Sequence, residues 1–199
     1  MEEHQKSHSK NHFYEIRNLD RQKNFDKISD VKRAARIIYL NRTCYNGLYR
    51  VNQAGQFNSP FGYYKNPNIV NKSLIWAMSK YLNENKIEIF SLDYRKILDN
   101  LKKDDFVYLD PPYLPMSASS SFTSYTKEGF NINEQIQLKR ECDKLNAKGI
   151  KFLLSNSDHP LFHKLYKDYE IITVKAKRLV NSQAQNRQNV NEILIRNYS

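Results

Sequence analysis

The stretch "DFVYLDPPYLP", residues 105–115, joins an apolar run to an acidic residue, two prolines and a tyrosine. The run from Phe106 to Leu109 has no polar side, which is typical of a strand covered on both faces in a parallel α/β sheet. The prolines restrict φ and lack N–H groups, so the strand must end there in a rigid turn. Ligands of open α/β sheets bind beyond the carboxyl ends of strands, which makes Asp110 a candidate site residue.

The turn also presents a specific set of chemical groups. Asp110 offers a strong hydrogen-bond acceptor, the backbone at Pro111 and Pro112 offers another, and Tyr113 offers a flat aromatic face. Two acceptors and a ring suit an exocyclic amine on a planar base, and a base in a duplex has to be flipped out to reach such a pocket. These four residues are the candidate catalytic residues. The alternative is a strand-ending turn in which Asp110 only caps the backbone.

The second half of the chain alternates strand and helix patterns around this stretch. Period and turn residues predict strands over 86–92, 105–110, 150–156, 169–177 and 190–198, and helices over 94–101, 131–149 and 160–166. Asn131 is the expected cap of the long helix, and Gly149 its end. The last two strands are joined by a long polar loop. This order predicts an α/β domain over residues 87–199.

The first half has a different character. Residues 1–12 are polar and predict a flexible tail, while patterns of period 3.6 predict helices over 13–25, 31–43 and 71–82. Between them, residues 44–68 carry Asn-Gly, Ala-Gly, Ser-Pro and Phe-Gly turns with aromatic, amide and basic residues in between. Such a loop is typical of a recognition surface. Residues 13–86 are therefore expected to form a separate, small recognition lobe.

Charge and composition narrow the class of partner. Lys and Arg number 32 against 21 Asp and Glu, a formal net charge of +11, and there are 14 Tyr. The excess favours nucleic acid, on whose bases aromatic rings can stack; a merely basic soluble protein is the alternative. Two cysteines without metal-ligand spacing predict reduced thiols and no metal site. No apolar run reaches the length of a bilayer span, so we expect a cytoplasmic protein that does not enter a membrane.

The motifs also resemble a known family. "LDPPY" is similar to the catalytic motif of amino-group DNA methyltransferases. "YLNRTCYNGLYRVNQAGQFNSPFGYYKNP", "DPPYLPMSASSSFTSYTKEGF" and "LLSNSD" resemble, in the same order, segments of the Dam-like, D12-class adenine-N6 methyltransferases that act on GATC. The resemblance runs from about residue 30 to the end. It implies a partial Rossmann-like class I methyltransferase sheet with parallel strands and a C-terminal antiparallel hairpin, plus a small helical and loop DNA-recognition lobe.

The resemblance implies a reaction and a set of roles. S-adenosylmethionine would be the cofactor and double-stranded DNA the partner. Asp93 and Tyr94 match the place that contacts the cofactor, together with Asp110. Five residues of the recognition lobe match DNA contacts, with Arg50 in the place of a guanine-reading arginine: Tyr45, Asn46, Leu48, Arg50 and Pro60. Basic residues of the last loop and the strand before it are expected to bind phosphates: Lys175, Lys177, Arg178 and Arg187.

The chain departs from the family pattern at the cofactor cradle. The family has a lysine- and glycine-bearing motif and a glycine-rich turn that have no counterpart among the five glycines of this sequence, in which no G-x-G occurs. The leading hypothesis is a site-specific adenine-N6 DNA methyltransferase. The alternatives are a non-catalytic DNA-binding remnant, or one subunit of a split enzyme completed by a separate N-terminal methyltransferase chain. Methylation of RNA or of a protein glutamine is a third hypothesis, which the GATC-like segment disfavours.

Overall fold

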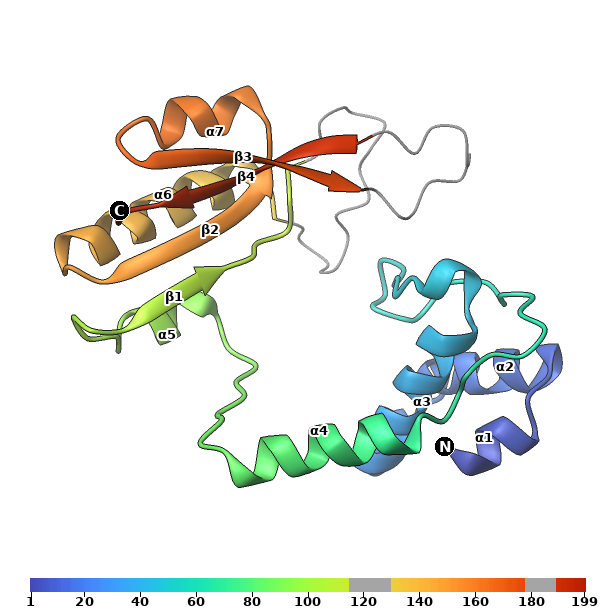
Figure 1. The fold of residues 1–199 in the computed structure, drawn as a ribbon. Helices are drawn as coiled ribbons and strands as arrows, with labels where there is room; N and C mark the ends of the chain where they lie inside the picture. Colours follow the sequence, from blue (N-terminus) through green and yellow to red (C-terminus); the bar gives the residue numbers. More distant parts are fainter. Residues whose placement is uncertain (115–129, 178–188) are drawn as a thin grey trace. The chain divides into compact units, whose positions relative to one another are not determined.

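A computed structural model describes residues 1–114, 130–177 and 189–199 (Figure 1). The chain divides into two compact units, residues 1–90 and 91–199. The division lies after Phe90, whereas the predicted one lies after residue 86. No helix among the described residues is both long and apolar enough to cross a membrane.

Unit 1 is built from helices and one long loop. Its α-helices and 3₁₀ turns follow in chain order: α1 Glu2–Lys6, α2 Lys10–Asn18, η1 Leu19–Arg21, η2 Phe25–Lys27, α3 Asp30–Thr43, η3 Tyr45–Gly47 and α4 Lys72–Glu84. The predicted helices over 31–43 and 71–82 are confirmed by α3 and α4. The predicted helix over 13–25 is shorter, because α2 ends at Asn18 and two 3₁₀ turns follow.

The expectation of a flexible tail over residues 1–12 is wrong. These residues form α1 and the start of α2, which is capped by the Ser9 side chain accepting from the His12 backbone N–H. His4 stacks on Tyr39 with ring centroids 4.8 Å apart, and the His8 ring lies 3.1 Å from the Tyr39 hydroxyl. The polar histidines thus serve as aromatic packing partners, a role that a reading of polarity alone does not detect.

The core of unit 1 lies between α2, α3 and the loop. It contains six buried side chains: Phe13, Tyr39, Leu40, Cys44, Phe57 and Ile69. Arg36 of α3 is also buried and forms an ion pair of 2.7 Å with Asp20. Because Phe57 belongs to the loop and donates its backbone N–H to the same Asp20 carboxylate, the loop is anchored to the helices.

Unit 2 is a mixed sheet with helices. Its elements are α5 Tyr94–Leu98, β1 Phe106–Leu109, α6 Ile132–Ala147, β2 Lys151–Ser157, α7 Pro160–Leu165, β3 Glu170–Lys177 and β4 Asn189–Arg196 (Figure 1). The strand order is β1-β2-β4-β3, with β1 parallel to β2 and the other neighbours antiparallel. The predicted C-terminal hairpin is therefore confirmed, and parallel pairing among these strands is limited to one pair.

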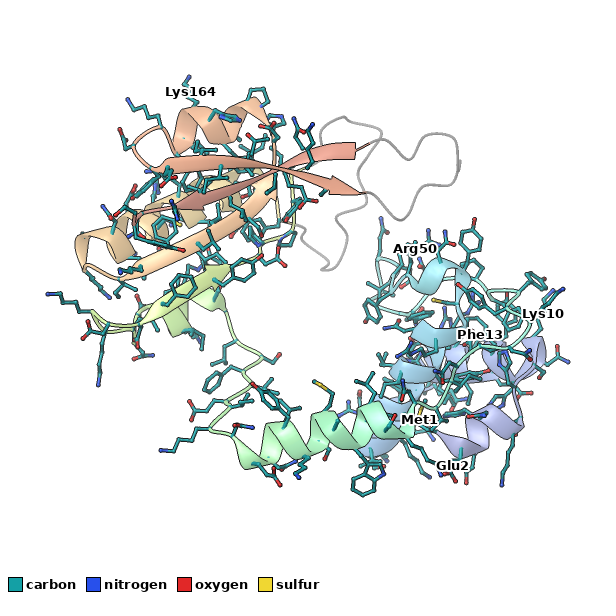
Figure 2. The ribbon with its side chains drawn as sticks, viewed as in Figure 1. Met1, Glu2, Lys10, Phe13, Arg50 and Lys164 are labelled. Carbon is teal, nitrogen blue, oxygen red and sulfur yellow. The ribbon has the colours of Figure 1, made fainter. Side chains whose placement is uncertain are left out.

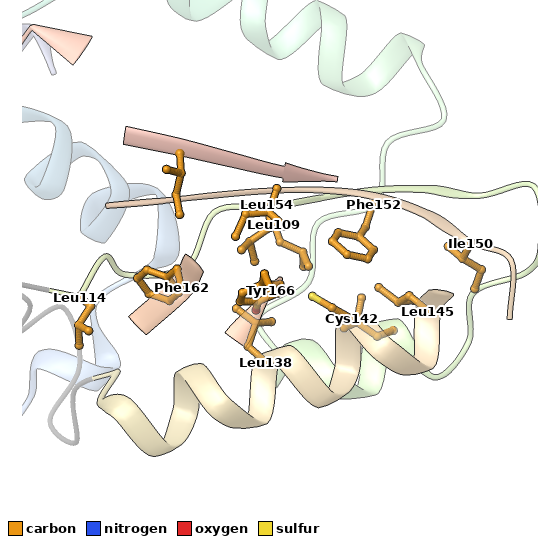
Figure 3. Close-up of a cluster of buried hydrophobic side chains, with 13 residues drawn as sticks. Leu109, Leu114, Leu138, Cys142, Leu145, Ile150, Phe152, Leu154, Phe162 and Tyr166 are labelled. Carbon is orange, nitrogen blue, oxygen red and sulfur yellow. The ribbon is translucent and has the colours of Figure 1, made fainter. Parts of the chain in front are cut away.

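One face of the sheet is packed. Phe152 and Leu154 of β2 point toward Leu138, Cys142 and Leu145 of α6 (Figure 3). Each such side chain, when fully buried, contributes roughly 1.5–3 kcal/mol to folding. Asn131 caps α6 as predicted, and Gly149 takes a φ of +68° just after it, which allows the chain to turn sharply into β2.

The other face of β1 is open, which corrects the expectation of a strand covered on both faces. Phe106 and Tyr108 alternate with the packed Val107 and Leu109, and each is 56% exposed. The strand predicted over 86–92 does not form; this segment has no described sheet partner, and Ile89 is 77% exposed. Helix α4 likewise buries none of its side chains. An apolar sequence pattern shows which side chains a strand could bury, but those side chains are buried only where another element packs against them.

Candidate functional site

Asp110 stands at the carboxyl end of β1, as predicted, and a neighbouring strand orients it. Its Oδ1 accepts a hydrogen bond of 2.8 Å from the Ser155 hydroxyl of β2. The Ser155 oxygen in turn accepts from the Tyr108 hydroxyl over 3.3 Å. The contact follows from the parallel register, in which Leu109 lies opposite Leu154, so that the next residues of both strands meet. The Asp110 carboxylate is exposed, and the bond from Ser155 orients it.

A side chain of α6 forms a hydrogen bond with the proline turn after Asp110. The Gln135 side-chain Nε2 donates to the Pro112 carbonyl oxygen over 3.0 Å, and Gln135 itself is fully buried. Its Oε1 accepts over 3.2 Å from Nδ2 of Asn156, which is also fully buried. A buried amide costs free energy unless its groups are hydrogen-bonded, and here both amides find partners.

Leu114, which follows the turn, is hydrogen-bonded through both its backbone N–H and its carbonyl. The Leu114 backbone N–H donates to Asn156 Oδ1 over 3.4 Å, and the Leu114 carbonyl accepts from the Ser157 hydroxyl over 2.8 Å. Three consecutive residues at the end of β2, Ser155 to Ser157, therefore contact the Asp-Pro-Pro-Tyr-Leu segment. The turn is rigid through its prolines and also through this polar cradle.

Tyr113 is half-buried beside Asp110. Burial raises the pKa of its phenol above the usual value, and a hydrogen bond with Ser155 partly opposes that shift. The ring is therefore neutral near pH 7. A neutral, partly accessible ring next to the oriented Asp110 carboxylate has the chemistry of a stacking platform for a planar base.

The two predicted cofactor residues begin α5. Asp93 caps this helix, and the Arg95 guanidinium that hydrogen-bonds the Asp93 carboxylate lowers its pKa to about 2. Tyr94 packs against the core of unit 2. Its hydroxyl is buried without a hydrogen-bond partner among the described residues, and burial raises its pKa to about 12. This orphaned hydroxyl is the kind of group that a ligand's polar atom can complete.

The predicted DNA-contact residues of unit 1 are brought together on one loop. Bridges between Cys44 and Phe61, and between Val51 and Phe57, close residues 44–61 into a compact lobe. Asn46 adopts a φ of +55°, a conformation that Asn tolerates better than most residues and that turns the chain between α3 and the loop. The Tyr45 backbone N–H donates to the Pro60 carbonyl over 2.8 Å, which joins the two ends of the loop.

The predicted DNA-contact side chains of this loop are exposed, although Cys44 and Phe57 of the same loop are buried in the core. Tyr45 is 50% exposed, and Leu48 and Pro60 are also exposed. Arg50 lies on the lobe (Figure 2), where its Nε donates over 2.7 Å to Asn58 Oδ1 while the side chain remains exposed. Such a bond orients the guanidinium plane, as bidentate recognition of a base or phosphate requires.

The predicted phosphate contacts are only partly described. Lys175 lies on β3 and is exposed, and Lys177 is the last residue of that strand. Arg178 and Arg187 lie outside the described residues, as does the segment 115–129 that continues the Asp110 turn. The predicted contact residues of the loop belong to unit 1, whereas the Asp110 turn belongs to unit 2.

Both cysteines are free and buried. Burial raises the pKa of the Cys44 thiol to about 11 and that of Cys142 to about 12, so neither is a thiolate nucleophile near neutral pH. Within the described residues, no group of three or more His, Cys, Asp or Glu is arranged to hold a metal ion.

Sequence reasoning missed the residues that hold the site. Ser155, Gln135, Asn156 and Ser157 were not predicted as site residues, although "LLSNSD" places three polar residues at the end of an otherwise apolar strand. That position, next to the carboxyl end of a parallel neighbour, is the signal that could have found them. Gln135 carries no comparable local signal, because it is one polar residue among many in α6.

Comparison with known proteins gives a family match over most of the chain. A family model described as D12 class N6 adenine-specific DNA methyltransferase matches residues 1–180. The match starts at residue 1 rather than near residue 30, in agreement with the ordered helices at the N-terminus.

Individual relatives agree with this match. The Type II methyltransferase M1.LlaDCHI of Lactococcus lactis subsp. cremoris is 48% identical over 196 residues, which are 98% of this chain and 69% of the relative. The Type II methyltransferase M.MjaIII of Methanocaldococcus jannaschii is 44% identical over 95% of this chain and 65% of its own length. A DNA adenine methylase of Serratia marcescens is 37% identical over 82% and 60%. The chain thus spans about two thirds of these relatives.

Proposed function

Because the chain belongs to the D12 class of N6 adenine-specific DNA methyltransferases, we propose that Asp110 to Tyr113 bind the exocyclic amine of an adenine flipped out of double-stranded DNA and promote its methylation. The target is a GATC-like site. Asp110 and a proline carbonyl accept hydrogen bonds from the two N–H groups, and Tyr113 stacks on the base.

The observation that carries the proposal is the fixed carboxylate. The amine lone pair of adenine is delocalised into the ring, so nitrogen is a poor nucleophile until hydrogen bonds draw it toward a tetrahedral form. Asp110 is exposed and is oriented by the 2.8 Å bond from Ser155. The Pro112 carbonyl accepts from Gln135, and the Pro111 carbonyl is the proposed second acceptor for the amine. Acceptors held in place before binding need no reorganisation during the reaction.

The methyl donor of the proposal is S-adenosylmethionine, which supplies an electrophilic methyl group on a sulfonium. Asp93, ionised over the whole physiological range, and the buried, unpartnered Tyr94 hydroxyl are suited to its adenosine end. The rest of the cofactor has no glycine-rich cradle in this sequence. The residues present therefore fit one end of the group. The buried, protonated cysteines agree with direct transfer that forms no covalent enzyme intermediate.

The lobe of residues 44–61 reads the DNA in this proposal. Arg50, with its oriented guanidinium, contacts a guanine in the major groove, and Leu48 and Pro60 make apolar contacts. Tyr45 and Asn46 enter the duplex beside the flipped base. Lys175, Lys177, Arg178 and Arg187 bind phosphates, in keeping with the net charge of +11. Cytoplasm is the expected compartment for such an enzyme.

A second candidate function is the reading half of a split methyltransferase, completed by a separate N-terminal chain. The observation that favours it is that no G-x-G turn occurs in the sequence. In this form the 199 residues would bind duplex and hold the target adenine but would bind S-adenosylmethionine only together with the partner.

The two candidates differ in one titration. Calorimetric titration of the 199-residue chain with S-adenosylmethionine, with and without a GATC duplex, measures whether this chain binds cofactor by itself. If it does, Asp110→Ala should lower the rate of methyl transfer by at least about 100-fold, the scale on which one fixed transition-state contact is lost.

Asp104→Ala is the matched control, because Asp104 is exposed in the turn before β1, and it should transfer methyl groups at the wild-type rate. Duplex binding without cofactor binding would support the split enzyme. Unchanged methyl transfer in Asp110→Ala would refute the proposed role of the turn.

A further inference from the structure

Two side-chain amides of the proposed site are buried away from solvent. Gln135 of α6 and Asn156 of β2 are both fully buried and lie 3.2 Å apart, Oε1 to Nδ2. The two residues are 21 positions apart in the sequence. Residues of this polarity are rarely buried without a specific partner.

The backbone determines which way each amide points. Asn156 Oδ1 accepts from two backbone N–H groups, those of Leu114 at 3.4 Å and Ser157 at 2.9 Å. A backbone N–H can only donate, so the atom facing it is the amide oxygen and the Asn156 NH₂ faces Gln135. Gln135 must then accept with Oε1 and donate with Nε2, and its acceptor is the Pro112 carbonyl at 3.0 Å.

We propose that Gln135 and Asn156 are positioning residues that set the Asp110–Leu114 turn in its binding geometry. This inference rests on the proposed function of the turn. Asn156 accepts a hydrogen bond from the Leu114 N–H and donates one to Gln135 Oε1. Gln135 in turn donates to the Pro112 carbonyl and so fixes its direction. The prolines limit φ but leave the peptide planes free to rotate through ψ, so the direction of each carbonyl needs an external partner.

The decisive variant is Gln135→Glu, which keeps the shape and replaces the donor by an acceptor. At pH 8 the side chain no longer donates to Pro112. We expect the Leu114 amide to exchange with deuterium at least 10-fold faster than in the wild type, without DNA present. A carboxyl buried here would protonate well above its usual range and donate again, so the ratio of exchange rates should return toward one as the pH is lowered to 6.

A fluorescence measurement links the turn to base binding. A GATC duplex with 2-aminopurine in place of the target adenine reports flipping. Gln135→Glu should lower the flipping signal at pH 8 at least 5-fold, while its duplex affinity stays within 2-fold of the wild type because the recognition lobe is untouched.

Gln137→Glu is the control, since it makes the same change on the same helix at a side chain that accepts from Arg140 on the surface. It should match the wild type in exchange and in flipping. Ser157→Ala, which deletes only the hydroxyl that donates to Leu114, is the second variant should Gln135→Glu not fold. It should also raise exchange at Leu114.

The outcomes separate this inference from the proposed function. If the wild-type chain binds no duplex or flips no base, the proposed function is refuted. Hydrogen exchange at Leu114 then still tests the positioning role by itself. Leu114 exchange unchanged in Gln135→Glu and Ser157→Ala overturns the inference. So does a rise shared equally by all β2 amides, since that would be loss of stability rather than release of the turn.

Discussion

Asp20 and Arg36 attach the loop of residues 44–61 to the helices of unit 1. Arg36 is 4% exposed in its side chain, pairs with Asp20 at 2.7 Å, and donates to the carbonyls of Ile16 and Arg17. The same Asp20 oxygen accepts from the Phe57 backbone. A charge taken out of water is tolerated only with such complete pairing. The pair therefore couples the helices to the loop that carries Arg50.

Arg36→Ala should destabilise unit 1 by about 1.5–3 kcal/mol, because it removes a buried charge-assisted bond to Asp20 and leaves that carboxylate with Arg21, 2.6 Å away, as its cation. Thermal or urea unfolding measures this loss. Arg33→Ala is the matched control on the same helix: Arg33 pairs with Asp30, which is 90% exposed, and such pairs contribute about 0–1 kcal/mol. Equal effects of the two substitutions would show that Asp20 does not depend on Arg36.

Among elements, α1 and α2 depend on three histidines packed around Tyr39. The His4 Nδ1 and His12 Nε2 atoms lie 3.1 Å apart, so at most one proton can be shared between them. Burial lowers the pKa of His4 below its usual value, and the N-terminal amino group and His12 add to the shift while Glu3 opposes it. Burial and His12 likewise lower the pKa of His8. Packing around Tyr39 thus favours the neutral forms of His4 and His8.

Acid should therefore loosen these helices. A histidine whose pKa is lowered by folding contributes stability above its unfolded pKa, about 6.5, and loses it as the pH falls toward the folded pKa. We expect amides of α2 to exchange faster at pH 5.5 than at pH 7.5 after correction for intrinsic rates. The double substitution His4→Gln and His8→Gln should remove most of this pH dependence.

His163→Gln, in α7 of unit 2, is the control and should leave the pH dependence of α2 unchanged. A double variant whose α2 amides respond to pH as strongly as the wild type would contradict the role given to His4 and His8.

At the scale of the whole molecule, each unit leaves apolar side chains uncovered. In unit 2, one face of β1 exposes Phe106 and Tyr108, although a strand in parallel pairing is normally buried on both faces. In unit 1, α4 exposes Leu74, Ile75, Trp76, Met78 and Tyr81. The matched relatives extend beyond the aligned region by about a third of their length. We expect the polypeptide that corresponds to this third to cover the face of β1.

This expectation is tested by supplying that third of the Lactococcus relative as a separate polypeptide. It should bind the 199-residue chain, and Phe106→Ser should weaken the association at least about 10-fold, equivalent to roughly 1.4 kcal/mol. Calorimetry measures both. Val31→Ser removes an apolar side chain that is 79% exposed on α3 and should have no effect. Equal binding by Phe106→Ser would place the contact elsewhere.

Local features of the fold were predictable from the sequence. The strand before Asp110 and the helix from its Asn131 cap to Gly149 follow from patterns within about 20 residues, whereas the antiparallel pairing of the last two strands was implied by the family resemblance. Periodicity, capping and turn chemistry act over that range. The segment 86–92 shows the limit: its apolar pattern suits a strand, yet a strand forms only where another strand pairs with it.

The sequence by itself determined where the candidate site begins, because an acidic residue and two prolines at the end of a strand can form few other structures. It also determined the family, through motifs in a particular order. Only the tertiary structure decided what holds that turn. Gln135, Ser155 and Asn156 reach it from α6 and β2, and such contacts depend on strand register and helix packing, which join residues distant in the chain and leave no periodic trace in it.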